Sequence, residues 1–144
     1  IYEGTNGIQA ADLVTRKLGY ANGDVLKALL RDAANGAPAG SPLAALAEDC
    51  IAVADWMVAE ASLDDRLAGS VPFCTMCAVA VAGWQLSLQV PAAAARGGAL
   101  AKGKAAIAAY FANQLAAEAR GLRTSATGGA ATLYALTDGE LANL

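Results

Sequence analysis

Apolar side chains recur along this chain every three or four residues, which is the spacing of amphipathic α-helices. A first stripe joins Ile8, Ala11, Val14 and Leu18, and it follows the helix-capping pair Thr5–Asn6. No segment shows the clean alternation of apolar and polar residues that marks a strand. The pattern therefore predicts a succession of helices.

Glycine, proline and capping residues divide this pattern into five predicted helices. They are expected over about 5–18, 22–35, 42–62, 70–90 and 99–121, with N-terminal caps at Asn22, Ser41 and Ser70. Pro91 and the Gly97–Gly98 pair are predicted to end the fourth helix. Residues 63–69 form a connector with one helical turn at most, and the strip 132–136 is expected to pack back onto the body.

Large apolar residues define the predicted inner faces. These are Val25, Leu26, Leu29, Leu30 and Ala33 in the second helix, Leu43, Leu46, Cys50, Val53, Trp56 and Met57 in the third, and Leu100, Ile107, Phe111, Leu115 and Leu122 in the fifth. The solvent-exposed face of the third helix is predicted to carry Glu48, Asp49, Asp55 and Glu60. We predict an all-α fold, an up-and-down bundle of four main helices plus a shorter leading helix.

The amino-acid composition excludes several kinds of binding and catalytic site. The 144 residues include 38 alanines, 16% charged residues and no histidine, with a net charge of −3. This balance gives no basic footprint for nucleic acid, and the absence of histidine excludes Ser-His-Asp and Cys-His catalysis. Three cysteines do not make a disulfide framework, and Cys74-x-x-Cys77 lacks the second pair that a zinc site needs. We predict no metal site, plain core packing for the cysteines, and a reduced cytosolic compartment.

The stretch from Leu67 to Ala95 carries no charge and is long enough to cross a bilayer. Two readings are open, a membrane span and the central helix of a bundle that is covered on all sides. Interruptions such as Pro72, Gln85 and Gln89, and flanks without a Lys/Arg cluster, favour the central helix. We therefore expect no membrane span.

One short segment carries candidate chemistry. Glu3 stands directly before Gly4–Thr5, a turn that opens a helix. Gly4 lets another molecule approach the backbone, and Thr5 with the first free amides of the helix can bind polar groups. Glu3 beside an apolar ligand would have a raised pKa and could act as a base. By spacing alone, a bare helix cap with an exposed glutamate is the simpler interpretation.

A resemblance of this segment to a known family favours the catalytic glutamate over the bare helix cap. The run IYEGTNGIQAADLVTRKL strongly resembles the part of flavin-dependent acyl-CoA dehydrogenases that carries the catalytic base. The later runs SVPFCTMCAVAVAGWQLS, ALAKGKAAIAAYFANQLAAEARGL and GGAATLYAL resemble the extra C-terminal helical domain of a bacterial branch, the methylthiopropionyl-CoA dehydrogenase type. The chain departs from that branch at Asn113–Gln114, where no catalytic group is expected.

The resemblance implies a role for each residue of the motif. Glu3 matches the catalytic base, Tyr2 and Gly4 match substrate-binding positions beside the thioester, and Thr5, Asn6, Gly7 and Gln9 match FAD-binding positions. The complete enzyme would oxidise an acyl-CoA to a trans-2-enoyl-CoA, with FAD as hydride acceptor and an electron-transfer flavoprotein as partner. It would be a homo-oligomer in the bacterial cytoplasm.

The same resemblance suggests how the chain is organised. Residues 1–19 would end the dehydrogenase's helical domain and residues 20–144 would form the added bundle. The start at Ile1 suggests a piece of a longer protein, which by itself would neither hold FAD tightly nor turn over substrate. Two alternatives are a non-catalytic helical assembly domain and an unrelated helical adaptor or membrane protein.

Overall fold

In a computed structural model, which describes residues 5–143, the chain folds into helices and connecting turns without a strand in that range. The elements are α1 Thr5–Asp12, η1 Leu13–Lys17, η2 Tyr20–Gly23, α2 Asp24–Gly36, α3 Pro42–Ala59, α4 Leu63–Ala68, α5 Ser70–Arg96, α6 Gly98–Tyr110, η3 Phe111–Leu115, α7 Ala116–Arg120, α8 Arg123–Ala126 and α9 Asp138–Leu141. The all-helical class expected from the sequence is confirmed.

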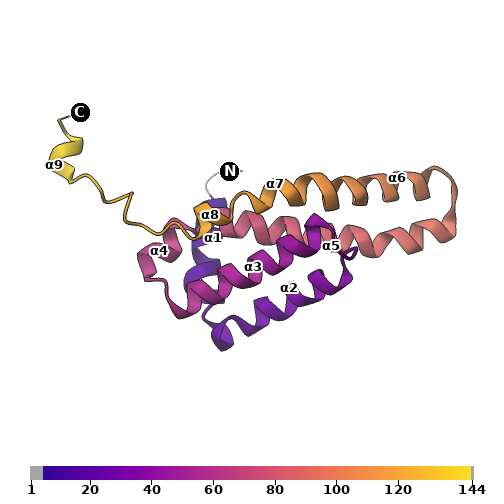
Figure 1. The fold of residues 1–144 in the computed structure, drawn as a ribbon, viewed down its shortest axis with the longest axis horizontal. Coiled ribbons are helices and arrows are strands. Elements are labelled where there is room, and N and C mark those ends of the chain that lie inside the picture. The colour runs from indigo at the N-terminus through magenta and orange to yellow at the C-terminus, as the bar shows by residue number, and fades with distance from the viewer. Residues whose placement is uncertain (1–4, 144) are drawn as a thin grey trace.

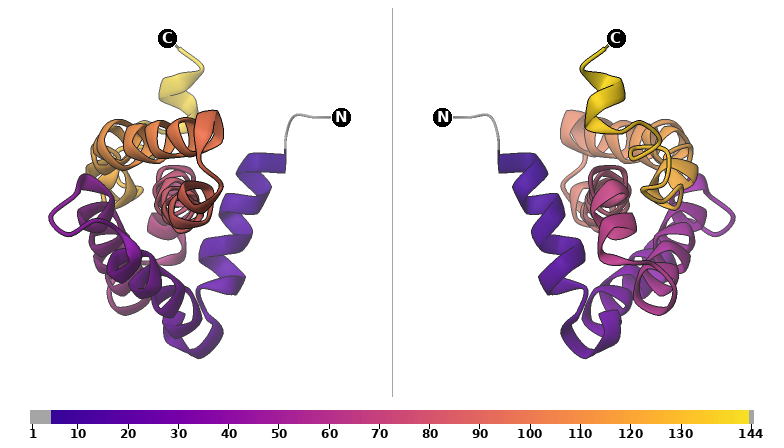
Figure 2. Two further views of the ribbon diagram at one scale, coloured as in Figure 1. Left: turned by 90° about the vertical axis from the view of Figure 1, so that its right-hand side faces the viewer. Right: turned by 90° about the vertical axis from the view of Figure 1, so that its left-hand side faces the viewer.

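The long helix α5 lies at the centre of the arrangement. It packs against α1, the α2–α3 pair, and the α6–α7 helix, and a view along the molecule shows these neighbours on three sides of it (Figure 2). Towards its C-terminal end, α5 pairs with α6 in a hairpin that projects from the rest of the molecule (Figure 1). The body of the protein is therefore built around the first half of α5.

The core sits between α2, α3 and α5. The predicted inner face of α3 is confirmed, because Leu43, Leu46, Cys50, Val53 and Met57 are buried, while Trp56 is half-buried against them. Ser41 caps this helix as expected, since its Oγ accepts a hydrogen bond from the Ala44 amide at 3.3 Å. The large side chains of Phe73 and Met76 on α5 complete the core.

The leading helix was predicted well except at its first stripe residue. α1 continues through a π-helical turn, η1, so one helical run covers residues 5–17. Val14 and Leu18 are buried, whereas Ile8 is 68% exposed, which corrects its assignment to an inner face. Ile8 lies two residues ahead of Ala10, the first buried residue of the helix, and therefore about 200° away from it around the helix axis.

Two predicted caps are wrong. Asn22 adopts a left-handed backbone with φ of 54°, and Gly23 with φ of 79° occupies the cap position before α2. Gly69, not Ser70, precedes α5, and the Ser70 hydroxyl donates to the Leu67 carbonyl at 2.7 Å. Gly23 has the positive φ that glycine adopts without strain, whereas Gly69 has an ordinary φ of −84° and is required because a Cβ there would collide with the Ala126 carbonyl.

The connector is also more regular than expected. α3 ends at Ala59, ahead of the predicted residue 62, and Ser62 starts α4 through a capping box with Asp65. Asp65 Oδ1 also accepts a hydrogen bond from the Ala130 amide at 2.8 Å. This carboxylate therefore ties the beginning of the C-terminal segment to α4.

The prediction that Pro91 ends the fourth helix is wrong. α5 runs through Pro91 to Arg96, where Gly97 terminates it with φ of 71°. A proline inside a helix removes a backbone hydrogen bond and costs about 3 kcal/mol. Packing of α6 along this part of α5 offsets that cost, because the two helices lie side by side up to the turn at residues 97–98.

The fifth helix has the predicted extent and a different inner face. Its buried residues are Ala108, Ala112, Ala116 and Ala119, while Leu100 and Ile107 are 42% and 50% exposed. Phe111, Leu115 and Leu122 are half-buried. A stripe of methyl groups lets the helix backbone approach its neighbours closely, and this turns the larger side chains of Leu100 and Ile107 outward.

The strip at residues 132–136 does not pack back. After Ala130 the chain leaves the body, and every residue from 131 to 143 is exposed (Figure 1). We call these residues the C-terminal arm. It ends in the short helix α9, which Thr137 and Glu140 cap reciprocally.

Candidate functional site

Of the residues that the sequence singled out, Thr5, Asn6, Gly7 and Gln9 lie at the start of α1, which packs beside α5. Asn6, Gln9 and Ala10 form one wall of a groove of about 340 Å³, and the opposite wall comes from α5 through Val71, Cys74, Thr75, Ala78 and Val79. We call it the α1–α5 groove. It exists because α1 meets α5 through small side chains.

The candidate residues are only partly brought together. Tyr2, Glu3 and Gly4 lie outside the described residues. Thr5, Asn6, Gly7 and Gln9 are all exposed, and of these Asn6 and Gln9 line the groove. The side chains of Asn6 and Gln9 each carry one amide donor group and one carbonyl acceptor, so they can bind a neutral polar ligand from either side.

Sequence reasoning missed the opposite wall of this groove. Cys74 and Thr75 had been assigned to core packing or left without a role, but Cys74 is half-buried and Thr75 is exposed. The Thr75 hydroxyl donates to the Val71 carbonyl at 3.0 Å. Only the three-dimensional contact between α1 and α5 places these residues opposite Asn6 and Gln9, and the sequence pattern of either helix gives no sign of it.

Among the residues that the structure describes, no charged side chain lines the α1–α5 groove. The charges of the leading helix lie further along, where Asp12 forms ion pairs with Arg16 at 2.6 Å and Lys17 at 3.2 Å. The hydrogen bond from Arg16 lowers the pKa of Asp12. A neutral groove of this kind suits an uncharged part of a ligand, such as a flavin ring or an acyl chain, better than a phosphate.

The three cysteines are free thiols. Cys50 and Cys77 are buried, as predicted for core packing. A hydrogen bond to Cys50, together with burial, raises the pKa of the Cys77 thiol well above its usual value. Both cysteines belong to the buried core cluster, so we assign them to core packing.

Asp49 was expected on the wet side of α3, and that prediction is wrong. Its side chain is only 10% exposed and accepts hydrogen bonds from Arg120 Nε and Arg123 Nη1, both at 2.7 Å. Two guanidinium groups compensate the carboxylate, which allows its burial. The cluster joins α3 to α7 and α8 and is structural.

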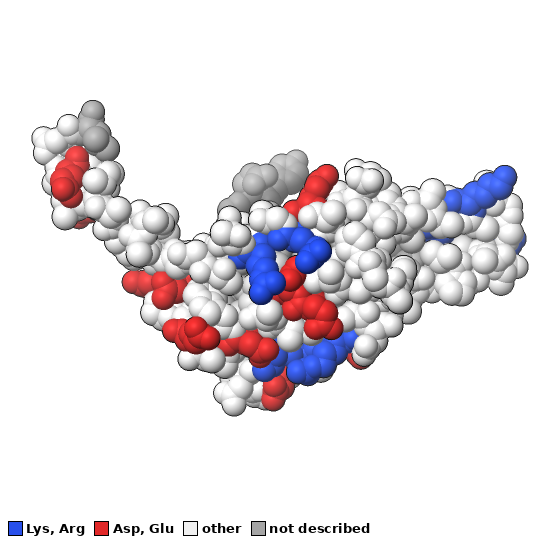
Figure 3. Space-filling view, viewed as in Figure 1, with Lys and Arg blue, Asp and Glu red and all other residues white. Residues whose placement is uncertain are grey.

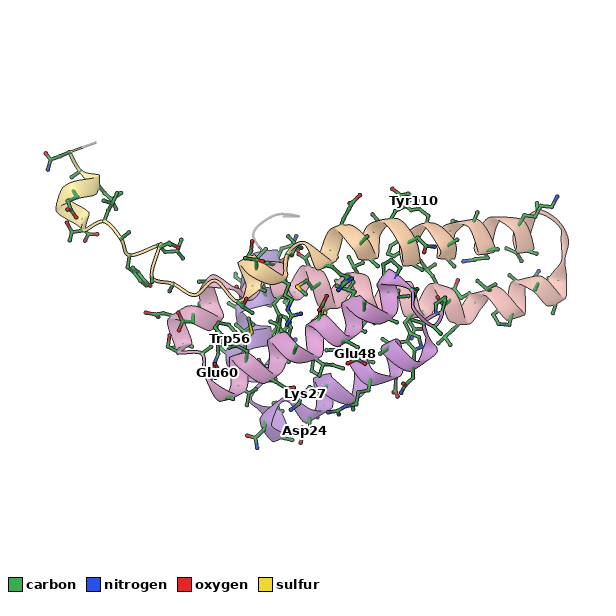
Figure 4. The ribbon with its side chains drawn as sticks, viewed as in Figure 1. Asp24, Lys27, Glu48, Trp56, Glu60 and Tyr110 are labelled. Carbon is green, nitrogen blue, oxygen red and sulfur yellow. The ribbon has the colours of Figure 1, made fainter. Side chains whose placement is uncertain are left out.

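A second ion-pair cluster joins α2 to α3 on the outside of the molecule. Lys27 Nζ lies 3.1 Å from Asp24 Oδ1 and 3.1 Å from Asp55 Oδ1, and Figure 4 shows Asp24 and Lys27 on α2 beside α3. The two carboxylates are more than half exposed. Glu48 and Glu60 are exposed, as predicted.

A larger cleft of about 460 Å³ lies at the other end of the molecule. It runs between the α2–α3 turn and the α5–α6 hairpin, and its lining includes Ala105, Ala108, Ala109 and Ala112 from the alanine-rich helix, with Val90 and Pro91 from α5. We call it the alanine cleft. No residue of the predicted site contributes to it.

Within residues 5–143 no group of three or more histidine, cysteine or acidic side chains could hold a metal ion. By length and composition alone α5 could cross a membrane, with a mean hydropathy of 1.5 over its most apolar window. The core helix of a soluble protein meets the same criterion. Helices pack on three sides of α5 (Figure 2), and 28% of that window is buried, so length and composition alone do not define a membrane span.

The fold and the site define a helical domain with a neutral groove at its leading helix. The family model described as acetyl-CoA dehydrogenase C-terminal like matches residues 21–137, which is most of the chain. The chain therefore belongs to this family, and it is the C-terminal part of an acyl-CoA dehydrogenase-like protein. Searches of curated proteins and of solved structures gave no match.

The match covers the helical domain and leaves out the leading segment. Residues 1–20, with Glu3 and the remaining motif positions, precede it. The roles assigned to those positions and the domain boundary at residues 19–20 stay predictions from the resemblance.

Proposed function

We propose that this chain completes a flavin-dependent acyl-CoA dehydrogenase of the methylthiopropionyl-CoA branch, and that Glu3 takes the α-proton of the acyl-CoA thioester. The observation that supports this most is the family match over residues 21–137, directly behind the base-carrying motif. FAD, when bound in the complete enzyme, would accept the β-hydrogen as hydride. We further propose that the domain is an up-and-down bundle whose leading helix ends the preceding helical domain.

The α1–α5 groove supports the assignment of the cofactor-binding residues. Asn6 and Gln9 present exposed amide groups on its wall, and Thr5 and Gly7 lie in the first turn of α1, where backbone amides are free. These groups fit the polar edge of a flavin. The uncharged wall from α5 would exclude water from one side of the flavin ring. Tyr2 and Gly4 would line the thioester side, and Glu3 would act from the same turn.

A base in this position contributes through placement and desolvation. Positioned proton abstraction accelerates a reaction by about 10²–10⁴-fold. A carboxylate that is covered by an acyl chain loses hydration, which raises its pKa towards the working pH. Glu3 is therefore expected to be a stronger base in the substrate complex than in the free enzyme.

The test uses the complete enzyme that contains this chain. Glu3→Gln should lower turnover of an acyl-CoA by about 10²-fold or more, with FAD retained at its normal ratio. Glu48→Gln, the same change at an exposed glutamate of α3, is the matched control and should leave turnover unchanged. Unchanged turnover in Glu3→Gln would exclude the proposed base.

The remaining expectations belong to the complete enzyme. We propose that it passes electrons to an electron-transfer flavoprotein, forms a homo-oligomer, and works in the bacterial cytoplasm. The 144 residues alone should neither retain FAD nor oxidise acyl-CoA. Among its described lining residues, the α1–α5 groove offers a surface for the flavin ring and no cationic side chain for the FAD phosphates. Flavin absorbance that co-purifies with this chain at a near one-to-one ratio would contradict that expectation.

A second function, assembly, has its own support. Large apolar side chains are exposed on α6 and the C-terminal arm, including Leu100, Ile107, Leu133 and Tyr134. Figure 4 shows Tyr110 projecting from α6 away from the body, and it is 56% exposed. Surfaces of this kind mark contacts with other protein. The assembly role is compatible with a catalytic Glu3 in one protein.

A further inference from the structure

The two ends of the molecule carry opposite charge. Arg96, Lys102 and Lys104 are the only charged residues between Trp84 and Ala117, and they lie at the tip of the α5–α6 hairpin. We call them the basic tip. Within residues 5–143 none of the three forms an ion pair, and Lys104 Nζ donates instead to Gln89 Oε1 at 2.6 Å.

The opposite end is acidic. The C-terminal arm carries Asp138 and Glu140 and no basic residue, and it leaves the body beside α4, where Asp64 is exposed. Figure 3 shows this separation, with acidic side chains on the arm and basic ones at the far end of the molecule. A molecule that is polarised along its long axis favours antiparallel pairing, because each end then meets the opposite charge.

The arm also carries large apolar side chains that are exposed. Leu133, Tyr134 and Leu136 are 68%, 69% and 45% exposed. The alanine cleft offers an apolar surface of matching kind, and it is lined by the α2–α3 turn and the α5–α6 hairpin, which projects on the side of the molecule opposite the arm (Figure 1). In this conformation the arm does not reach the cleft of its own chain.

The order of groups along the two surfaces matches. Along the arm, the apolar strip 133–136 comes first and the acidic residues 138 and 140 follow. Along α6, from the body outward, the alanines that line the cleft at 105–112 come first and Lys104 and Lys102 follow.

We propose that two copies of this chain pair antiparallel and exchange their arms. The apolar strip of each arm lies in the partner's alanine cleft, and Asp138 and Glu140 lie against the partner's basic tip. The same contact occurs twice around a two-fold axis, so the assembly closes as a dimer. This inference refines the assembly role and does not depend on the role of Glu3, so either can fail without the other.

The first test is a charge exchange in the 144-residue chain. Lys102→Glu and Asp138→Lys are both exposed positions, and each single change should weaken dimerisation at least tenfold in sedimentation equilibrium. The double variant should restore it. Arg31→Glu on α2 makes the same charge change at an exposed position away from both surfaces, and it should leave the dimer unchanged. Since exposed charges are screened, the wild-type dimer should weaken with added salt.

The second test separates exchange between copies from folding back. In a Cys74→Ser background, one sample carries Leu136→Cys and another carries Ala109→Cys, a residue of the alanine cleft. Mild oxidation of the mixture should give a disulfide-linked pair. Unchanged circular dichroism verifies that each variant is folded. A chain that stays monomeric at 100 μM, roughly the upper range for weak interfaces, overturns the proposal. A disulfide that forms only when both cysteines are on one chain also overturns it.

Discussion

The two halves of α5 pack against their neighbours by different means. In the body, α5 meets α3 through large side chains such as Phe73, Met76 and Leu43, all fully buried. In the hairpin, α5 meets α6 and η3 through alanines, with Ala93, Ala108 and Ala112 at the buried positions. The body thus gains stability from buried area, while the hairpin gains it from close backbone approach.

This difference has a consequence for the surface. Because alanines fill the inner face of α6, its larger apolar residues are left outside, as at Ile107 and Tyr110. The body has no comparable exposed strip on α3, whose leucines face inward. The hairpin therefore carries exposed apolar side chains of a kind that α3 lacks and that often mark contacts with other protein.

The largest expected effect on stability comes from removing a large side chain from the body, and the same kind of change in the hairpin should cost much less. Phe73→Ala removes a fully buried ring from the body and should lower the free energy of unfolding by about 3–5 kcal/mol. Leu100→Ala on the hairpin removes a side chain that is 42% exposed and should cost under about 1 kcal/mol. Urea unfolding of both variants measures the contrast, and equal losses would contradict it.

Ala116→Leu enlarges a side chain of the alanine stripe at the start of α7. Ala116 is fully buried and lines no cleft, so the added methylenes must displace neighbours, and the expected loss is about 1–3 kcal/mol. Ala117→Leu, an exposed position of α7, is the matched control and should leave unfolding nearly unchanged. An Ala116→Leu variant as stable as the wild type would mean that the packing of this helix is loose and does not depend on alanine.

The sequence was informative where helices bury large residues. It gave the helical class, the inner face of α3 and the extent of the fifth helix, because apolar periodicity and capping residues report on local structure. It misassigned Leu100 and Ile107, since size was taken as a sign of burial. A stripe of alanines carries no such sign in a chain with 38 of them.

The candidate site shows the same limit. Asn6 and Gln9 could be selected from the sequence because a specific motif resembles a known family, while Cys74 and Thr75 on the opposite wall of the groove could not. Their relation depends on how α1 crosses α5. Asp49 was misassigned for a similar reason, because its partners Arg120 and Arg123 are more than 70 positions away in the sequence.

Asp49 links the two regions, and its loss should have an intermediate effect. Asp49→Asn removes the charge that holds Arg120 and Arg123 to α3, and we expect a loss of about 1–2 kcal/mol. The value is at the low end for a buried pair because both arginines are about half exposed and can turn to solvent. Hydrogen exchange should show faster opening in α7 and α8, with the α2–α3 core unchanged. Uniform loss of protection would indicate that the cluster does not join separate regions.

The smallest expected effect comes from replacing glycine by alanine. This substitution should change the free energy of unfolding in opposite directions in the hairpin and in the body. Gly103 lies on the exposed side of α6, and a Cβ there would meet no atom within 4 Å. Gly103→Ala should therefore raise the free energy of unfolding by about 0.5–1 kcal/mol, since alanine is the better helix former. At Gly83 on α5 a Cβ would lie 2.7 Å from Leu43 Cδ1 in the body, so Gly83→Ala should destabilise the protein despite the same gain in helix propensity. Thermal unfolding of the two variants side by side measures both signs. A stabilising Gly83→Ala would mean that Leu43 moves aside freely, and the body would then be no more tightly packed than the hairpin.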